Sequence, residues 1–410
     1  MLVGAAETDI TPSWPVELGG FVARVQPSIG VHDPVHARAL YVACDRGDGL
    51  LWLHAECLGF DTRFVSRIRA RLSKALALPP LAICLSATHT HSAPATITLT
   101  LTGHQDLRYM EWLEERLCEV ATEATRSVEE CRMLSGRGSC HLGAERRRDE
   151  TAPVDDTVTV TAFERPGGGL KAVVVNYAVH NVAMGHENRL ISSDIHGYAA
   201  SWLHEKMPGK PICLMLPGAC ANINPPSEGA DFERVARWGE QLGGSVAAAI
   251  ESASSADSDT ASTELLAIDI PLEKLDETAL QARTESLLAT MGDGSTYASA
   301  RVREAARIWQ QHMSTRTQGD SVAMDVQLIT LGSTCYACIG AEVFSHMAQA
   351  VPAVCTVGCA NGIIGYLAPV HIYDVGGYEV DSAYVFYDTQ RILPGGFEKV
   401  AALLRERTQC

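Results

Sequence analysis

The feature that most constrains the fold of this chain is the alternation of short apolar runs with longer amphipathic stretches. The apolar runs are rich in branched residues and have the length of strands, as in ARALYVA, LLWLHAE, LAICLSA, DTVTVTAF, KAVVVNYAV, KPICLML, MDVQLITL and AVCTVG. Between them, apolar residues return every three or four positions, as in helices, over Asp61–Leu78, Tyr109–Glu130, Gly197–Met207, Phe232–Glu251 and Arg303–Met313. The pattern predicts a mixed α/β fold in which mixed β-sheets are flanked by helices.

Two polar breaks interrupt this pattern, at SASSADSDTAS (Ser252–Ser262) and at Gly292–Ser295. We interpret both as surface loops because the candidate functional motifs lie on both sides of them. No internal repeat is visible. We therefore expect a single domain over residues 1–410.

The charge of the chain argues against several classes of function. The formal net charge is −16 and no dense basic run is present, so neither nucleic acid nor an anionic membrane is an expected partner. No apolar stretch reaches the roughly 18–20 residues that span a bilayer. The opening MLVGAAETDITP lacks the pattern of a secretory signal. We expect a cytoplasmic protein without stable membrane association that acts on a small molecule, and the oligomeric state stays open.

The thirteen cysteines are spread along the chain and many lie inside apolar runs, as Cys84 does. We interpret them as buried free thiols in a reducing compartment. Cys335 and Cys338 form a C-x-x-C within the strand-like run STCYACIG. Three-residue spacing on a strand places two side chains on opposite faces, so metal binding by this pair is not expected.

The strongest local motif is Thr88-His89-Thr90-His91-Ser92, directly after the apolar run LAICLSA. On an extended segment, residues two apart share a face, so His89 and His91 are expected to point into one site at the end of a buried strand. Neutral imidazole is a common zinc ligand. The alternative is a pair of hydrogen-bonded loop histidines.

Further candidates are individually weaker. His180 ends the run KAVVVNYAVH, and Asp194 lies two residues before His196 near a predicted helix, where a carboxylate could orient the imidazole. Glu342 follows a strand-like run in CIGAEVF, and Tyr366 lies in ANGIIGYLAP. Each has an ordinary structural interpretation when considered alone.

Together these motifs resemble the neutral/alkaline non-lysosomal ceramidase superfamily, in a short form with the catalytic domain only. The matching segments are GAAETDITP, HARAL, ATHTHS, NYAVHNVAM, SSDIHGYA, GAEVF and ANGIIGYLAPVHIYDVGGYEV, in the family's order. The resemblance implies the catalytic-domain fold of that family. We expect no secretion signal and no C-terminal immunoglobulin-like module of the kind found in that family.

The resemblance also implies one zinc ion per chain, held by two histidines, a glutamate and a tyrosine. Carried onto this sequence, the ligands are His89, His180, Glu342 and Tyr366. Two nitrogens and two hard oxygens suit Zn²⁺ and leave a position for water or a carbonyl. His91 would face the reacting carbonyl or the leaving group.

Family enzymes also bind substrate with an arginine. The matching position lies in the run Arg146, Arg147 and Arg148, of which we favour Arg147, while the other two stay open. Tyr378, Asp194, His196 and Glu56 are further candidates for orientation or proton transfer.

One segment departs from the family pattern. Ceramidases carry Gly-Asp-Val-Ser-Pro beside the zinc, whereas this chain has asparagines, Asn222 and Asn224, in the segment Cys220–Pro225. An amide is neither a nucleophile nor a base near neutral pH, but it can donate a hydrogen bond to an oxyanion. The sequence therefore favours attack by water that the zinc activates, with His91 moving protons and Asn224 holding the oxyanion.

We expect a zinc-dependent amidohydrolase acting on a linear N-acyl bond of a small soluble substrate. An esterase or lactonase is the alternative, because the same chemistry attacks either carbonyl. A relative that binds metal and ligand without catalysis is a third interpretation, favoured by the two asparagines. TITLTLTGH (Thr96–His104) departs from the family's glycine-rich continuation and is expected to reshape the pocket.

Overall fold

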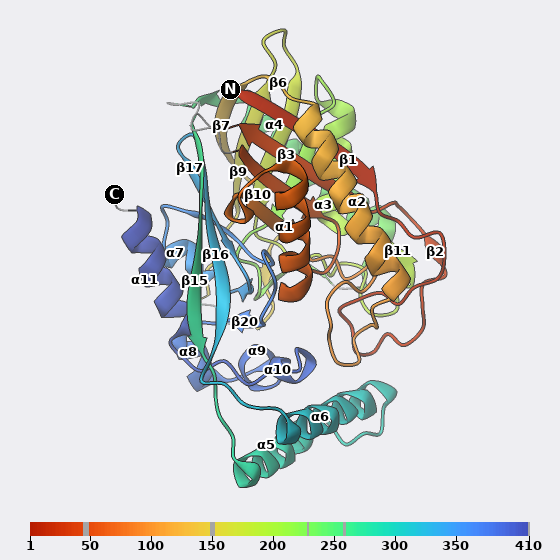
Figure 1. Cartoon of the computed structure of the whole chain (residues 1–410). Coiled ribbons are helices and arrows are strands. Elements are labelled where there is room, and N and C mark those ends of the chain that lie inside the picture. Colours follow the sequence, from red (N-terminus) through yellow and green to blue (C-terminus); the bar gives the residue numbers. More distant parts are fainter. Residues whose placement is uncertain (44–48, 148–151, 228, 257–259, 409–410) are drawn as a thin grey trace.

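Three β-sheets form the centre of the molecule, and helices cover their outer faces (Figure 1). The computed structural model describes residues 1–43, 49–147, 152–227, 229–256 and 260–408. Among these residues, no helix combines the length and apolar character needed to cross a membrane.

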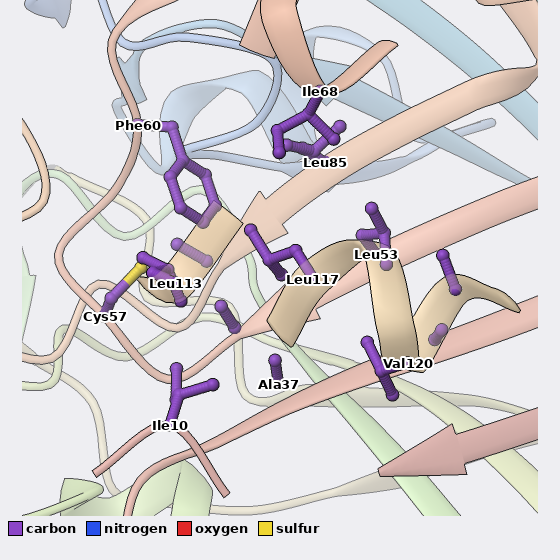
Figure 2. Packing of buried hydrophobic residues seen from close by; sticks show 14 of the residues in the cluster. Ile10, Ala37, Leu53, Cys57, Phe60, Ile68, Leu85, Leu113, Leu117 and Val120 are labelled. Carbon is purple, nitrogen blue, oxygen red and sulfur yellow. The ribbon is translucent and has the colours of Figure 1, made fainter. Parts of the chain in front are cut away.

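The first sheet has the order β5-β4-β3-β1-β6. Its strands are β1 (Leu2–Asp9), β3 (His36–Ala43), β4 (Gly49–Ala55), β5 (Ile83–Ala87) and β6 (Glu129–Glu130). Helices α1 (Thr62–Leu76) and α2 (Leu107–Arg126) pack on one face, and a 3₁₀ turn at Pro80–Ala82 precedes β5. Figure 2 shows Leu113, Leu117 and Val120 of α2 beside side chains of the strands.

The second sheet has the order β12-β10-β9-β7-β14. It comprises β7 (Arg132–Ser139), β9 (Thr157–Glu164), β10 (Leu170–Tyr177), β12 (Ile212–Pro217) and β14 (Ser254–Ser255). Helices α3 (Asp194–Lys206) and α4 (Phe232–Glu251) cover its outer face.

Residue alternation divides the strands between an outer core and a central core. In the first sheet, Leu51 and Leu53 pack toward α1 and α2, whereas Trp52 joins the central cluster. In the second sheet, Val174 joins the same central cluster while Val173 packs under α3 and α4. Both faces are buried, which explains why these strands read as continuous apolar runs.

The third sheet has the order β15-β16-β17-β19 and contributes residues such as Tyr336 to the central cluster. Its strands are β15 (Ala261–Pro271), β16 (Ser321–Leu331), β17 (Thr334–Ile339) and β19 (Cys355–Val357). Helix α11 (Gly396–Thr408) packs on its other face. Between β15 and β16 the chain forms a helical hairpin of α5 (Glu277–Thr290) and α6 (Tyr297–Thr315), set apart from the sheets in Figure 1.

Short elements connect these layers. Three two-stranded pairs are β2 (Gly30–Val31) with β11 (Leu190–Ile191), β8 (Ala144–Glu145) with β13 (Ile223–Asn224), and β18 (Glu342–Val343) with β20 (Tyr366–Leu367). The remaining helices are α7 (His346–Ala350), α8 (Val370–Val375), α9 (Tyr378–Asp381) and α10 (Ala383–Phe386).

The predicted mixed α/β architecture is confirmed. The helix predicted at Phe232–Glu251 has the same bounds as α4. The helix predicted to reach Glu130 ends at Arg126, because Glu129 and Glu130 pair with β1 as β6. Helix α5 was not predicted. The single-domain assignment stays a prediction.

The cysteines of the described residues are free thiols. Cys335 packs against the core under α11, whereas Cys338 lies in the central cluster. The two side chains of the C-x-x-C therefore lie on opposite faces of β17, as the strand spacing predicts.

Candidate metal site

Three histidines converge where the first two sheets end. His89 and His91 follow β5, and His180 follows β10. Their ring centroids are 4.7 Å (His89–His180), 5.1 Å (His89–His91) and 5.4 Å (His91–His180) apart. One nitrogen from each ring lies within 4.8 Å of the others. The sequence motif and the isolated histidine therefore belong to one cluster.

The backbone at His89 differs from the expected extended segment. His89 has a φ of 62°, in the left-handed region that few non-glycine residues adopt. A bend of the backbone at His89 brings the rings of His89 and His91 to the same side. The alternation of side chains along a strand is not what places them there. Such strained positions persist only where the surroundings hold them.

Backbone carbonyls orient two of the imidazole rings. Nδ1 of His89 lies 2.6 Å from the carbonyl oxygen of Leu58, and Nδ1 of His180 lies 3.3 Å from that of Cys220. A carbonyl only accepts, so each Nδ1 carries the proton and each Nε2 presents a lone pair. This is the arrangement by which proteins fix histidine ligands.

Glu342 supplies a carboxylate to the same point. Its Oε2 lies 3.3 Å from Nε2 of His89 and 3.7 Å from Nε2 of His180. The Tyr387 hydroxyl donates to the other oxygen, Oε1. Burial opposes ionisation, but His89, His180 and Tyr387 outweigh it and bring the pKa of Glu342 to about 2. Tyr387 had no signal in the sequence that marked it as a site residue.

Several buried polar atoms of this cluster have no hydrogen-bond partner in the described part of the chain. They are both ring nitrogens of His91, Nε2 of His180 and Oε2 of Glu342. Burial lowers the pKa of His91 and of His180 well below the usual value, so both rings are neutral. Unpaired buried polar atoms are costly, and neutral imidazoles with a carboxylate are the donor set that Zn²⁺ prefers. The residues therefore fit a zinc ion.

The structure leaves two ways to complete the ligand set. His89 and His180 belong to both, and the third ligand is Glu342 or His91. Tyr366 pairs directly with Glu342 between β18 and β20, and burial raises its pKa well above the ordinary value. Its role as a ligand stays a prediction.

Arg146, and not Arg147, lies beside Tyr366. Nη2 of Arg146 is 3.4 Å from the Tyr366 hydroxyl. Arg147 instead donates to Glu379 and to the carbonyl of Gly376. The two consecutive side chains thus point in different directions after β8, and the choice of Arg147 as the substrate-binding arginine stays a prediction. Arg148 lies outside the described residues.

Glu379 holds both arginines and was not recognised in the sequence. Its Oε1 accepts from Nε and Nη2 of Arg146 at 3.1 and 2.8 Å, and its Oε2 accepts from Arg147. Tyr378, the preceding residue, is 46% exposed, and its ring centroid lies 5.8 Å from that of Tyr366. Tyr378 is thus placed at the exposed side of the cluster.

The two asparagines have different environments. The amide of Asn222 donates to Oγ of Ser345 at 3.0 Å, and its oxygen accepts from the backbone N–H of Ser345 at 2.9 Å. This pair fixes the segment after Glu342, and the contact of Asn222 with a substrate carbonyl stays a prediction. Asn224 is buried on β13, next to Ile223, whose carbonyl accepts from the N–H of His180.

Glu56, Asp194 and His196 are buried outside the cluster of three histidines. Glu56 forms a buried ion pair with Arg38. The Asp194 carboxylate accepts from the N–H groups of Ala183 and Ile195, so it does not orient His196 as expected. Asn181 does so instead: its Nδ2 donates to Nδ1 of His196 at 2.8 Å and to the carbonyl of Thr88 at 2.6 Å.

Comparisons with known proteins identify the family and the fold of this chain. The family model described as "Neutral/alkaline non-lysosomal ceramidase, N-terminal" matches residues 1–260. Neutral ceramidases of Drosophila melanogaster and Drosophila pseudoobscura pseudoobscura are 29% and 28% identical over 239 and 240 residues, which is 51% of this chain and 33% of each fly protein. The chain thus aligns with about a third of the length of these relatives.

Two solved structures share the fold over 99% of this chain. The neutral ceramidase from Pseudomonas aeruginosa has a TM-score of 0.74 at 18% identity, with 74% of that chain covered. A structure described as "Ceramidase complexed with C2" has a TM-score of 0.73 at 17% identity, with 75% of that chain covered.

Proposed function

Since the chain belongs to the neutral/alkaline non-lysosomal ceramidase family, we propose that it is a zinc-dependent hydrolase that cleaves the linear amide bond of a small N-acyl substrate. The observation that carries this proposal is the cluster of His89, His180 and Glu342, in which Nε2 of His180 and Oε2 of Glu342 have no hydrogen-bond partner among the described residues. The relatives bear the name neutral ceramidase, and ceramide is an N-acyl amide.

His89, His180 and Glu342 would hold the ion, with Tyr366 completing its ligands. A zinc ion bound there supplies a Lewis acid for the carbonyl and an acidified water. The carbonyl contacts at the two Nδ1 atoms keep the rings of His89 and His180 in place before substrate arrives.

His91 is the residue suited to proton transfer. It is the least buried of the three histidines, and neither of its ring nitrogens has a hydrogen-bond partner. A neutral imidazole can accept a proton and return it to the leaving nitrogen. In this proposal His91 protonates the amine as the C–N bond breaks.

Arg146 and Asn224 are proposed to orient the substrate carbonyl and its oxyanion. Glu379 fixes the guanidinium of Arg146 next to Tyr366, and donors held in advance stabilise the charge that develops in the transition state. Asn222 is left out because Ser345 occupies its amide.

The test combines metal content with turnover. We expect about one zinc per chain by elemental mass spectrometry, and hydrolysis of N-acyl anilides that a chelator abolishes. His180→Ala and Glu342→Ala should lose zinc and activity together. His104→Ala and Glu187→Ala, at exposed residues, are the matched controls and should keep both.

Full turnover after thorough chelation would refute the metal-dependent chemistry. Zinc binding without turnover on any anilide, ester or lactone would instead support a relative that binds metal without catalysis.

A further inference from the structure

The α5–α6 hairpin is an insertion that the third sheet does not need. Strands β15 and β16 pair continuously up to Pro271 and Ser321, the residues at which the chain leaves and re-enters the sheet. A short turn would connect these strands equally well. The hairpin lies apart from the sheet, beside α9 and α10 (Figure 1). Its structure therefore calls for another explanation.

One end of the contact surface of α6 lies against the segment that carries Tyr387. Trp309 donates through Nε1 to the carbonyl of Thr389 at 2.8 Å, and its ring centroid lies 5.3 Å from that of Tyr384. Phe386 is buried in the same hydrophobic cluster. The next residue, Tyr387, donates to Glu342. Helix α6 thus supports the carboxylate side of the metal site.

The other contact of α6 reaches the histidine side. Arg301 donates through Nε to the carbonyl of Val22 and through Nη2 to the carbonyl of Leu101, both at 2.9 Å. Val22 follows Phe21, whose ring centroid lies 4.9 Å from that of His91. One guanidinium therefore joins two loops that flank His91.

These two loops also contact each other and the site directly. The N–H of Gly20 donates to the carbonyl of Thr102 at 2.9 Å. Gly20 has a φ of 101°, and a Cβ there would lie 2.2 Å from Nδ1 of His91. Only glycine fits a backbone so close to the imidazole. A displacement of either loop is thus transmitted to the immediate surroundings of His91.

Apolar and aromatic side chains occur in both loops and in the segment that Trp309 contacts. Phe21, Leu99 and Leu101 are partly exposed, and the exposed Tyr378 has its ring centroid 6.0 Å from that of Phe386. Leu99 packs in a cluster that also includes Tyr387, so the loops meet the opposite side of the site. An apolar group of a substrate would be the natural occupant of such surroundings.

We propose that the α5–α6 hairpin sets the acyl-chain selectivity of the site, and that Arg301 is its positioning residue. By binding both loops beside His91 while Trp309 holds the Tyr384–Thr389 segment, α6 fixes the position of Phe21 and Leu101 relative to Phe386, near which the ring of Tyr378 lies. This proposal rests on the proposed N-acyl substrate, and it adds that the residues held by α6 contact the acyl group.

The test uses binding, so that it does not depend on turnover. Zinc-loaded wild type, Arg301→Met, Arg301→Lys and Arg307→Met are titrated by calorimetry with linear acyl hydroxamates from acetyl to dodecanoyl. Arg307 is exposed on the same helix and serves as the matched control. Zinc content is measured for each variant.

We expect Arg301→Met to reduce the ratio of Kd values between the poorest and the best hydroxamate by about tenfold, because two charged hydrogen bonds are lost. The Kd of acetohydroxamate and the zinc content should stay unchanged. Arg301→Lys should give an intermediate ratio of Kd values, since a lysine ammonium lacks the planar set of donors with which a guanidinium reaches both carbonyls. Unchanged ratios, or a parallel loss for all chain lengths, would overturn the proposal.

A second measurement separates this proposal from the proposed function. In amide hydrogen exchange, residues 20–24 and 97–104 should exchange faster in Arg301→Met than in Arg307→Met. If no hydroxamate binds to wild type, the proposed function is what fails. Unchanged exchange in these two segments would show that Arg301 does not position the loops.

Discussion

Asn181 offers the sharpest test of how the fold positions the metal site. This buried amide follows His180 and makes three hydrogen bonds: its Nδ2 donates to the Thr88 carbonyl and to Nδ1 of His196, and its Oδ1 accepts from the His196 N–H. Since Thr88 precedes His89, one side chain links both histidine segments. Asn181→Ala removes all three bonds at once.

The magnitude follows from the groups that are left behind. Thr88 and His196 are buried, so the carbonyl, the N–H and the ring nitrogen lose their partners without gaining water. At about 1–3 kcal/mol for each of the three orphaned groups, the free energy of unfolding should fall by about 3–9 kcal/mol. The loss of orientation should weaken zinc binding by roughly 10- to 100-fold.

Urea unfolding of the zinc-free protein measures the first quantity, and competition with a fluorescent chelator measures the second. Asn188→Ala is the control, because Asn188 donates to Ser92 and Leu190 but is only partly buried. It should keep its zinc affinity. If Asn181→Ala binds zinc as tightly as wild type, the positioning argument is refuted.

Two further predictions concern neighbouring groups. Tyr387→Phe removes the donor to Glu342 and should weaken zinc binding about tenfold in the same competition assay, with the fold unchanged by circular dichroism; an unchanged affinity would contradict the role of Tyr387. Burial raises the pKa of Asp194 to about 7, so the folded state binds a proton between the unfolded pKa near 4 and pH 7, and this stabilisation is lost as the pH rises. The free energy of unfolding should fall by up to about 4 kcal/mol over that range, as measured by urea unfolding against pH, and Asp194→Asn should not show this component of the slope.

Much of the architecture could be predicted because strand burial leaves a direct trace in the sequence. KAVVVNYAV is apolar throughout because both faces of β10 are covered, by the central core and by α3 and α4. Helix α5 gave no comparable signal in the sequence. It packs against α6, the next helix, and against residues of α10, which lie far along the chain.

The candidate site was predictable only where ligands follow apolar runs, as His89 and His180 do. The choice among consecutive arginines depends on the register between Ala144 and Asn224, which joins segments far apart in the chain. The same is true of Ser345 with Asn222 and of Tyr387 with Glu342. No local pattern encodes such pairings.

The origin of the metal cluster in three different sheets has a consequence for biosynthesis. His89 follows a strand of the first sheet, His180 one of the second, and Glu342 one of the third. During synthesis from the N-terminus, both histidines are made long before the carboxylate. Until the third sheet packs against the other two, His89 and His180 therefore lack Glu342 as a third ligand. With Glu342 among the ligands, capture of the ion would then be a late event in maturation, and a newly made chain that has acquired zinc would be one whose layers have already assembled.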